Sequence, residues 1–186
     1  MISPNPPRGA TVWLTGLPSS GKSTIAAAVT AELRARGLPV EVLDGDELRR
    51  TVSAGLGFSR ADREENVRRI GALAASLAGG GAIVLVAVIA PYGDSRAEVR
   101  RLHTTIGVPY LEVHVATPLA VCAQRDVKGL YRRQAAGTLV GLTGVDDPYE
   151  APESPELRLD THHEPVETSA KAVLQLLIDA MSESRR

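Results

Sequence analysis

The stretch Gly16-Leu17-Pro18-Ser19-Ser20-Gly21-Lys22-Ser23 (GLPSSGKS) decides how this chain is interpreted. It fits the pattern G-x-x-x-x-G-K-[ST] and lies between an apolar run at 11–15, which predicts a strand, and residues 22–36, whose apolar positions recur at helical spacing. In this context the loop amides point at one centre, and the helix N-terminus adds positive charge there. The stretch therefore predicts a phosphate-binding loop. The alternative is a glycine-rich turn that caps a helix.

This loop predicts a site for ATP and Mg²⁺. Lys22 would bridge the β- and γ-phosphates, and the Ser23 hydroxyl would be a ligand of the Mg²⁺ bound to them. The residues predicted to contact the nucleotide here are Gly16, Leu17, Pro18, Ser19, Ser20, Gly21, Lys22, Ser23 and Thr24.

Composition and charge limit the classes of protein to consider. The 186 residues are 44% hydrophobic, enough for one substantial core, so a single domain over 9–186 is expected. A net charge of −1 gives no overall attraction for nucleic acid or an anionic membrane, and neither is an expected partner. Residues 1–8 predict a short disordered leader rather than a signal peptide, and the apolar run at 82–91 is too short to cross a membrane.

The single cysteine, Cys122, excludes an intrachain disulfide and is typical of the reducing cytoplasm, where we expect the protein. Its apolar neighbours favour a buried structural thiol over a catalytic one. None of the four histidines has the spacing to cysteine or acidic residues that a zinc site requires, so they are expected to be structural or at the surface. They are His103, His114, His162 and His163.

Strand and helix patterns alternate along the chain and predict an α/β fold. Strands are expected at 11–15, 40–43, 82–89, 110–115 and 157–160, and helices at 22–36, 94–105, 118–125 and 166–181 and from a cap at Ser59 to about Gly79. The continuously apolar run at 82–89 is typical of a strand in a parallel sheet covered on both faces. In the last helix the residues expected to face inward are Val173, Leu174, Leu177 and Ile178.

Residues 126–156 break this alternation with glycines, prolines and charged residues, and are expected to lack regular structure. A segment of this length in a compact domain is usually functional, so we interpret it as a lid.

Two acidic residues, Asp44 and Asp46, follow the strand at 40–43. If that strand lies beside the first, both carboxylates approach the γ-phosphate, where they can orient Mg²⁺-bound water or an acceptor hydroxyl. The run at 82–89 ends without the carboxylate of a motor or transporter ATPase, and the guanine-reading Asn-Lys-x-Asp motif is absent. The layout favours a small-molecule kinase. The alternative for the two acids is an Asx-rich turn.

Further blocks resemble the adenylylsulfate kinase family. After LDGD at 43–46 come LGFS at 56–59, DREEN at 62–66, RRI at 68–70, IAPY at 89–92, DVKGLY at 126–131 and TGVDDPYEAP at 143–152. Their order and spacing match that family over about residues 9–159. The resemblance implies a P-loop kinase fold with a mostly parallel five-stranded sheet and helices on both faces. It also implies transfer of the ATP γ-phosphoryl group to the 3′-hydroxyl of adenosine 5′-phosphosulfate.

The resemblance also implies roles for individual residues. The implied catalytic residues are Lys22, Asp46 and Lys128, and those implied to bind the substrate are Asp44, Asp46, Arg49, Phe58, Arg63, Asn66, Ile89, Ala90, Lys128 and Leu142. Phe58 would stack on the substrate adenine, Arg125 would lie over the ATP adenine, and Lys128 would neutralise phosphoryl charge as the lid closes.

These roles agree with the chemistry of the side chains. Arginine can form paired hydrogen bonds with an anionic ligand, and Arg63 and Asn66, three positions apart, lie on the same face of the predicted helix. The alternative for Arg63 is a solvated salt bridge to Glu64 or Glu65, and for Phe58 it is core packing. The basic pair Arg132–Arg133 is more typical of a solvated loop than of a site.

Two positions depart from the family pattern. Ala90 stands where many members have serine, so no phosphoserine can form there and direct in-line attack by the substrate hydroxyl is expected. Leu142 stands where phenylalanine commonly forms the second face of an aromatic sandwich around adenine, and we expect weaker adenylylsulfate binding as a result.

Two other functions stay open: a kinase for another small nucleotide or metabolite, and a non-catalytic nucleotide-binding regulator. A screen of acceptor molecules for ATP turnover would distinguish the first alternative from an adenylylsulfate kinase. Retention of Lys22, Ser23, Asp44, Asp46 and Lys128 together argues against the second. Because members of the resembled family are often dimers, a homodimer is expected.

Overall fold

The computed structural model describes residues 9–183 and has an α/β architecture around a five-stranded sheet. The strand order is β2-β3-β1-β4-β5, and every neighbouring pair is parallel. The strands are β1 (Ala10–Thr15), β2 (Val40–Asp44), β3 (Ile83–Ala87), β4 (Tyr110–Val115) and β5 (Leu157–Leu159). The predicted α/β fold and its five strands are thus confirmed. The expected leader at 1–8 lies outside the described residues.

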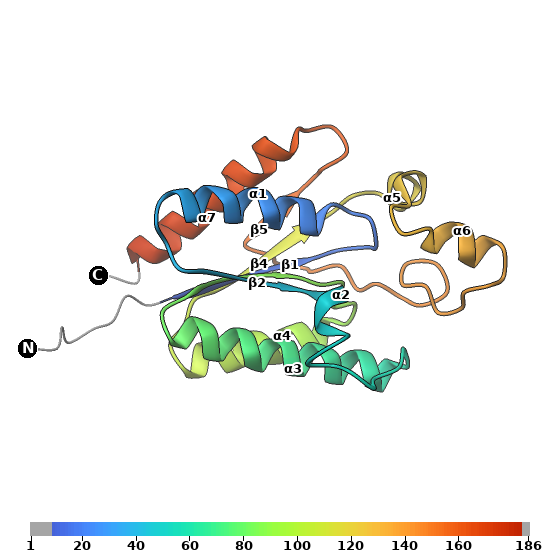
Figure 1. Cartoon of the computed structure of the whole chain (residues 1–186), viewed down its shortest axis with the longest axis horizontal. Coiled ribbons are helices and arrows are strands. Elements are labelled where there is room, and N and C mark those ends of the chain that lie inside the picture. Colours follow the sequence, from blue (N-terminus) through green and yellow to red (C-terminus); the bar gives the residue numbers. More distant parts are fainter. Residues whose placement is uncertain (1–8, 184–186) are drawn as a thin grey trace, which may run out of the picture.

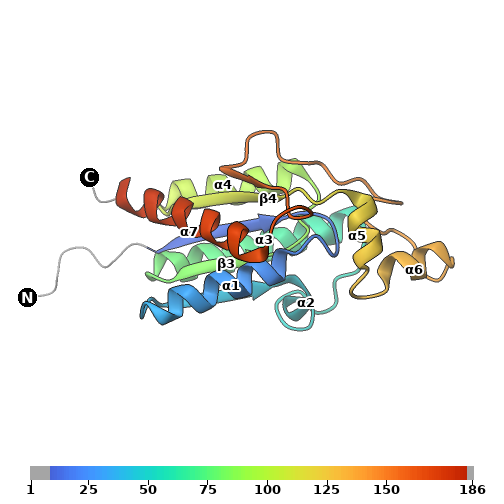
Figure 2. The same cartoon turned by 90° about the horizontal axis from the view of Figure 1, so that it is seen from above.

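Helices cover both faces of this sheet (Figures 1 and 2). They are α1 (Lys22–Ala35), α2 (Gly45–Leu48), α3 (Arg60–Gly79), α4 (Gly93–Thr105), α5 (Leu119–Arg125), α6 (Leu130–Ala135) and α7 (Val166–Glu183). Figure 1 shows α1 and α7 on one face and α3 and α4 on the other, with α5 and α6 beyond the end of the sheet. Among the described helices, none combines the length and apolar content that a membrane crossing requires.

The central strand β1 is buried along its whole length because both of its faces are covered by helices. Its side chains alternate between two cores. Val12 and Leu14 belong to the core that includes residues of α1 and α7, whereas Trp13 belongs to the core that includes residues of α3 and α4. This double burial fixes the position of the loop that follows the strand.

The long helix α3 begins at a reciprocal cap, as Ser59 predicted. The Ser59 hydroxyl accepts a hydrogen bond of 3.1 Å from the Asp62 amide, and the Asp62 carboxylate accepts one of 3.2 Å from the Ser59 amide. Two N–H groups that a helix start leaves unpaired are thereby satisfied. The cap fixes where the first turns of α3, which carry Arg63 and Asn66, begin.

The structure corrects several expectations. The strand at 40–43 does not lie beside the first strand, because β3 lies between β2 and β1, and the strand expected to reach Ile89 ends at Ala87. The 126–156 segment contains a helix, α6, in which the Asp126 carboxylate accepts hydrogen bonds from the amides of Tyr131 and Arg132, two of the N–H groups that a first helical turn leaves unpaired. The short helix α2 was also not predicted, since four residues are too few to show a period. Ile178, expected to face inward, is 42% exposed, because its neighbour Leu177 takes the inward position.

Candidate active site

A cleft of about 400 Å³ opens where the strands β1, β2 and β3 end. This position matches the general rule that ligands of open α/β sheets bind at the carboxyl ends of the strands. Most of the predicted site residues line it: Pro18, Ser19, Ser20, Gly21, Lys22, Ser23, Thr24, Asp44, Asp46, Arg49, Arg63, Asn66, Ile89, Ala90, Arg125 and Lys128. Four predicted residues are not among its lining residues: Gly16, Leu17, Phe58 and Leu142.

The phosphate loop curls between β1 and α1, and Gly21 at the start of the helix has a φ of 105°, a conformation that favours glycine. Lys22 is buried, and its Nζ donates hydrogen bonds to the carbonyl oxygens of Gly16 (2.9 Å) and Leu17 (2.7 Å) and to Ser20 Oγ (3.3 Å). Burial lowers the pKa of Lys22 from 10.5 to about 7. The amine therefore lies at the loop in a poorly solvated position, where an anionic partner would favour its charged form.

The back of this loop is braced by Arg125 and by three residues that the sequence analysis missed, Thr117, Tyr131 and Thr161. The Ser20 carbonyl accepts hydrogen bonds from Thr117 Oγ1 (2.8 Å), Thr161 Oγ1 (3.1 Å) and Arg125 Nη1 (3.2 Å). Tyr131 donates from its hydroxyl to the Pro18 carbonyl (3.0 Å). Thr117 and Thr161 both follow predicted strands. Because ligands of parallel sheets bind at the carboxyl ends of the strands, these two residues could have been predicted to lie near the site.

An oxygen-rich corner joins the start of α1 to the end of β2. Ser23 Oγ donates a hydrogen bond of 2.6 Å to Asp44 Oδ2, and Asp44 Oδ1 accepts one of 3.0 Å from the Asp46 amide. Hydroxyl and carboxylate oxygens are the ligands that Mg²⁺ prefers. The donor set beside the phosphate loop therefore fits this ion. Asp44 also caps α2 in the way that the Asx-turn alternative described.

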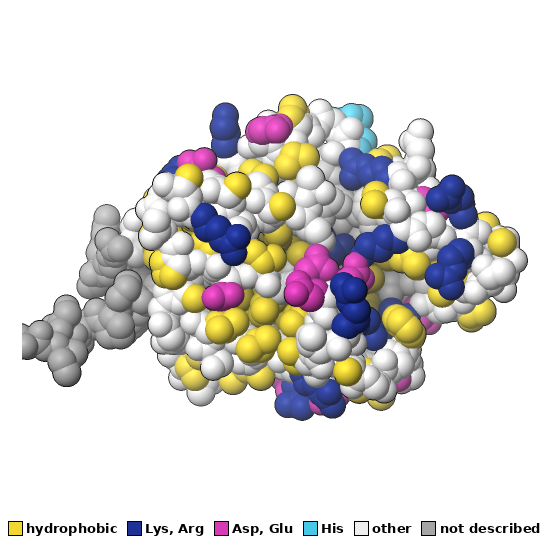
Figure 3. All heavy atoms as spheres, in the orientation of Figure 1, with side chains coloured by type: hydrophobic (Ala, Val, Ile, Leu, Met, Phe, Trp, Pro, Cys, Tyr) yellow, Lys and Arg dark blue, Asp and Glu magenta, His cyan; other side chains and the backbone are white. Residues whose placement is uncertain are grey.

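Asp46 and Lys128 form an ion pair that joins α2 to the 126–156 segment. Both side chains are more than half exposed. Figure 3 shows acidic and basic side chains gathered next to each other around α2. Such an exposed pair adds little to stability, so the two groups can separate at small cost when a ligand offers them other partners.

Arg63 is buried and uses its guanidinium to hold the second half of the 126–156 segment. It donates to Thr143 Oγ1 (2.6 Å), to the Gly141 carbonyl (2.6 Å) and to Asp147 Oδ2 (2.9 Å), and also to the Phe58 carbonyl (2.8 Å). The alternative of a solvated salt bridge to Glu64 or Glu65 is wrong, because those residues pair with arginines on the exposed side of α3.

Asn66, one turn further along α3, is buried and lines the cleft. Its Oδ1 atom has no hydrogen-bond partner among the described residues. Since an unpaired buried acceptor is costly, this oxygen is a candidate to accept a hydrogen bond from a bound ligand.

Phe58 is 64% exposed, so the alternative of core packing is wrong. The Arg49 guanidinium lies 4.4 Å from the centre of its ring. Leu142, in contrast, is buried in a small cluster with Cys122 and Tyr131. Stacking of adenine by Phe58 and Leu142 thus stays a prediction. Cys122 is the buried thiol that its apolar neighbours favoured, and burial raises its pKa.

Comparison with known proteins gives a consistent result. A family model described as Adenylylsulphate kinase matches residues 8–160. An adenylyl-sulfate kinase of Myxococcus xanthus (strain DK1622) is 53% identical over 169 residues, which are 91% of this chain and 91% of that protein. One of Synechococcus sp. (strain JA-2-3B'a(2-13)) is 52% identical over 170 residues, which are 91% of this chain and 95% of that protein.

A solved structure is also similar: the Mycobacterium tuberculosis APS kinase CysC in complex with AMPPNP and APS. Its TM-score is 0.90 at 46% sequence identity, and the match covers 93% of this chain and 99% of that one.

Proposed function

The chain belongs to the adenylylsulphate kinase family, and on this premise we propose how its cleft transfers the ATP γ-phosphoryl group to the 3′-hydroxyl of adenosine 5′-phosphosulfate. The products are 3′-phosphoadenylyl sulfate and ADP. The observation that carries the proposal is that the phosphate-loop lysine, Lys22, and the carboxylate of Asp46 line one cleft. The similar structure from Mycobacterium tuberculosis, described with AMPPNP and APS, supports this pair of ligands.

On the nucleotide side, the triphosphate lies in the phosphate loop with its charge facing the loop amides and the start of α1. Lys22 exchanges the carbonyls of Gly16 and Leu17 for phosphate oxygens, and its pKa rises because it gains an anionic partner. Ser23 and Asp44 would hold Mg²⁺, which neutralises phosphate charge when it is bound. Arg125, braced against the loop, lies over the adenine of ATP.

On the acceptor side, Asp46 orients the 3′-hydroxyl and accepts its proton, and Lys128 is released from Asp46 to stabilise charge on the transferred group. The unpaired Oδ1 of Asn66 accepts a hydrogen bond from a substrate donor such as a ribose hydroxyl. Arg49 and Arg63 provide positive charge for the phosphosulfate, and Phe58 stacks on the substrate adenine.

Transfer is direct. Ala90 lines the cleft, and its methyl side chain has no oxygen to accept a phosphoryl group. In-line attack needs the donor and acceptor held together in a site that stabilises charge, and the residues on the two sides of this cleft meet that need.

The test is ATP turnover with adenosine 5′-phosphosulfate, with the product identified as 3′-phosphoadenylyl sulfate. Lys22→Ala and Asp46→Ala are expected to lose activity by about 100-fold or more, because each removes a group that stabilises or positions the transition state. Glu47→Gln, which changes an exposed carboxylate next to Asp46, is the control and should keep the wild-type rate.

The two rival functions give different results in the same assay. A kinase for another acceptor would turn over ATP only with a different small molecule from a panel. A non-catalytic regulator would bind ATP with no transfer to any acceptor.

We also propose that the protein acts in the cytoplasm, in keeping with its single buried cysteine, and that it is a homodimer. Sedimentation analysis that gives the mass of one chain would contradict the homodimer.

A further inference from the structure

The acceptor side of the cleft has a wall, residues 89–91, that lies outside any strand because β3 ends at Ala87. The Ile89 carbonyl accepts a hydrogen bond of 2.5 Å from Thr15 Oγ1, and the Ala90 carbonyl accepts one of 2.7 Å from Arg96 Nη1. Ala90 has a φ of 45°, in the left-handed region that side-chain-bearing residues rarely adopt. Contacts from outside must therefore hold this wall in place.

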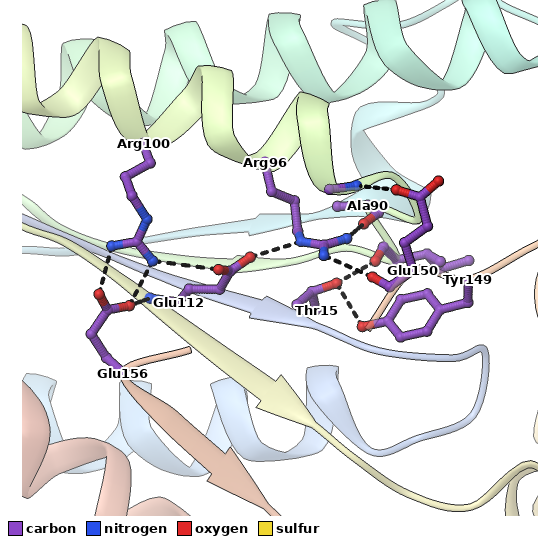
Figure 4. Close-up of polar contacts among 10 residues, drawn as sticks. Thr15, Ala90, Arg96, Arg100, Glu112, Tyr149, Glu150 and Glu156 are labelled. Carbon is purple, nitrogen blue, oxygen red and sulfur yellow. Dashed lines mark hydrogen bonds and ion pairs between the residues drawn. The ribbon is translucent and has the colours of Figure 1, made fainter. Parts of the chain in front are cut away.

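Arg96, in the first turns of α4, is 4% exposed and connects three parts of the fold (Figure 4). Besides the Ala90 carbonyl, it donates from Nε to Glu112 Oε1 on β4 (2.8 Å) and from Nη2 to the Glu150 carbonyl (2.7 Å). The planar guanidinium suits this task, since it carries several N–H donors in a fixed geometry.

Glu150 fixes the far end of the 126–156 segment to the same wall. Its amide donates to the Pro91 carbonyl (2.8 Å), and its Oε2 accepts a hydrogen bond from the Gly93 amide (2.6 Å). The neighbouring Tyr149 hydroxyl contacts Thr15 Oγ1 at 3.0 Å. The wall of the cleft and the base of the segment thus share one set of hydrogen bonds, and Arg96 contacts both.

A second arginine, Arg100, also pairs with Glu112 and provides a control for substitutions at Arg96. Arg100, one helical turn after Arg96, donates to Glu112 Oε2 (3.4 Å) and to both carboxylate oxygens of Glu156 (2.5 and 2.8 Å). Its hydrogen bonds go to Glu112 and Glu156 and not to Ala90 or Glu150. A change at Arg100 perturbs the same charge cluster without reaching the wall.

We propose that Arg96 is a positioning residue for the acceptor substrate: by holding the Ala90 and Glu150 carbonyls together, it sets the shape of the wall and ties the 126–156 segment to it. The inference rests on the proposed function for its effect on turnover. The contacts of Arg96 with the Ala90 and Glu150 carbonyls can also be tested without measuring turnover, by amide hydrogen exchange.

The experiment compares Arg96→Lys with Arg100→Lys. Lysine keeps the charge beside Glu112, but its single ammonium group cannot reproduce the fixed fork of the guanidinium. We expect Arg96→Lys to raise KM for adenosine 5′-phosphosulfate about tenfold, the scale of one lost charge-assisted hydrogen bond, with KM for ATP within about twofold of wild type. Arg100→Lys should leave both KM values near wild type.

Amide hydrogen exchange gives the second readout. The Glu150 amide should exchange faster in Arg96→Lys than in wild type and should be unchanged in Arg100→Lys. Equal effects of the two variants on KM and on this exchange would overturn the proposal. A wild-type protein that never phosphorylates adenosine 5′-phosphosulfate would instead overturn the proposed function and leave the exchange comparison valid.

If Arg96→Lys does not fold, Arg96→Met combined with Glu112→Leu carries the same test. This variant replaces a buried ion pair with apolar side chains, a change that is often tolerated, and leaves Arg100 paired with Glu156. It must show the same rise in KM for the acceptor and the same faster exchange at Glu150, and wild-type values of both would reject the role of Arg96.

Discussion

Ser23 Oγ and Asp44 Oδ2 are joined by a hydrogen bond of 2.6 Å, which links the first turn of α1 to the last residue of β2. This contact brings a hydroxyl and a carboxylate from separate elements to one corner of the cleft. It is the contact on which the proposed Mg²⁺ site next to the phosphate loop rests.

Ser23→Ala removes the hydroxyl from this corner. We expect the Mg²⁺ concentration for half-maximal rate to rise by about 10- to 100-fold, the range typical when a metal-site partner is lost. This concentration is measured by recording the reaction rate at increasing Mg²⁺ and saturating ATP. An unchanged Mg²⁺ dependence would argue against the site. Thr104→Ala, which removes an exposed hydroxyl on α4 that does not line the cleft, serves as the comparison.

The lowered pKa of Lys22, about 7, predicts a pH-dependent stability in the absence of ligand. Between pH 7 and 10.5 the unfolded chain binds more protons at this residue than the folded protein does. The Lys22 contribution to the free energy of unfolding therefore rises with pH in that window, by at most about 1.4 kcal/mol per pH unit, and is constant below it.

Lys22→Met should lack this contribution. Denaturant unfolding at pH 6.5 and pH 9 measures the difference, and equal pH dependence in wild type and variant would refute the assignment. The same lysine should take up a proton when ATP binds at pH 8, which calorimetry in buffers of different ionisation enthalpy detects.

Lys128→Gln separates catalysis from stability. The pair with Asp46 is exposed, so we expect the free energy of unfolding to change by less than about 1 kcal/mol. Loss of the charge near the transferred group should lower kcat by about 100-fold. Steady-state kinetics and thermal unfolding test both, with Arg133→Gln on the exposed side of α6 as the matched variant. A kcat like that of wild type would remove Lys128 from the mechanism.

Leu142→Phe introduces an aromatic ring at the position where we expect the second face of the adenine site. We expect tighter binding of adenosine 5′-phosphosulfate, by up to about 1–3 kcal/mol if the ring stacks on adenine. Because Leu142 is buried beside Cys122 and Tyr131, the larger ring should also cost about 1–3 kcal/mol of stability. Calorimetric titration and denaturant unfolding measure the two effects, and an unchanged or higher dissociation constant would contradict the first.

Contiguous features of the site could be predicted from the sequence. The phosphate loop has its donors, its helix and Lys22 within one stretch, so local pattern and function coincide. The cap at Ser59 is similarly local. Asp44 and Asp46 were expected near the phosphates if β2 lay beside β1; β3 lies between these strands, yet both acids line the cleft because parallel strands end at the same edge of the sheet.

Features that depend on distant partners could not be predicted. The apolar run at 82–89 predicted a strand to Ile89, yet its last carbonyl is held by Thr15, 74 positions away, and the strand ends at Ala87. Arg63 likewise finds its partners about 80 positions away, at 141–147. Local pattern records which side chains are apolar but not which distant group satisfies a given hydrogen bond.

With β1 at the centre of the sheet, the two flanks supply different halves of the cleft. Thr117 and Thr161, which follow β4 and β5, brace the phosphate loop, whereas Asp46 and Ala90, which follow β2 and β3, line the part of the cleft where we propose that the acceptor binds. Under the proposed function, substitutions on the β2 and β3 flank can change which alcohol is phosphorylated while the machinery for ATP stays intact. The residues that follow β2 and β3 are therefore the region in which to engineer a change of acceptor specificity.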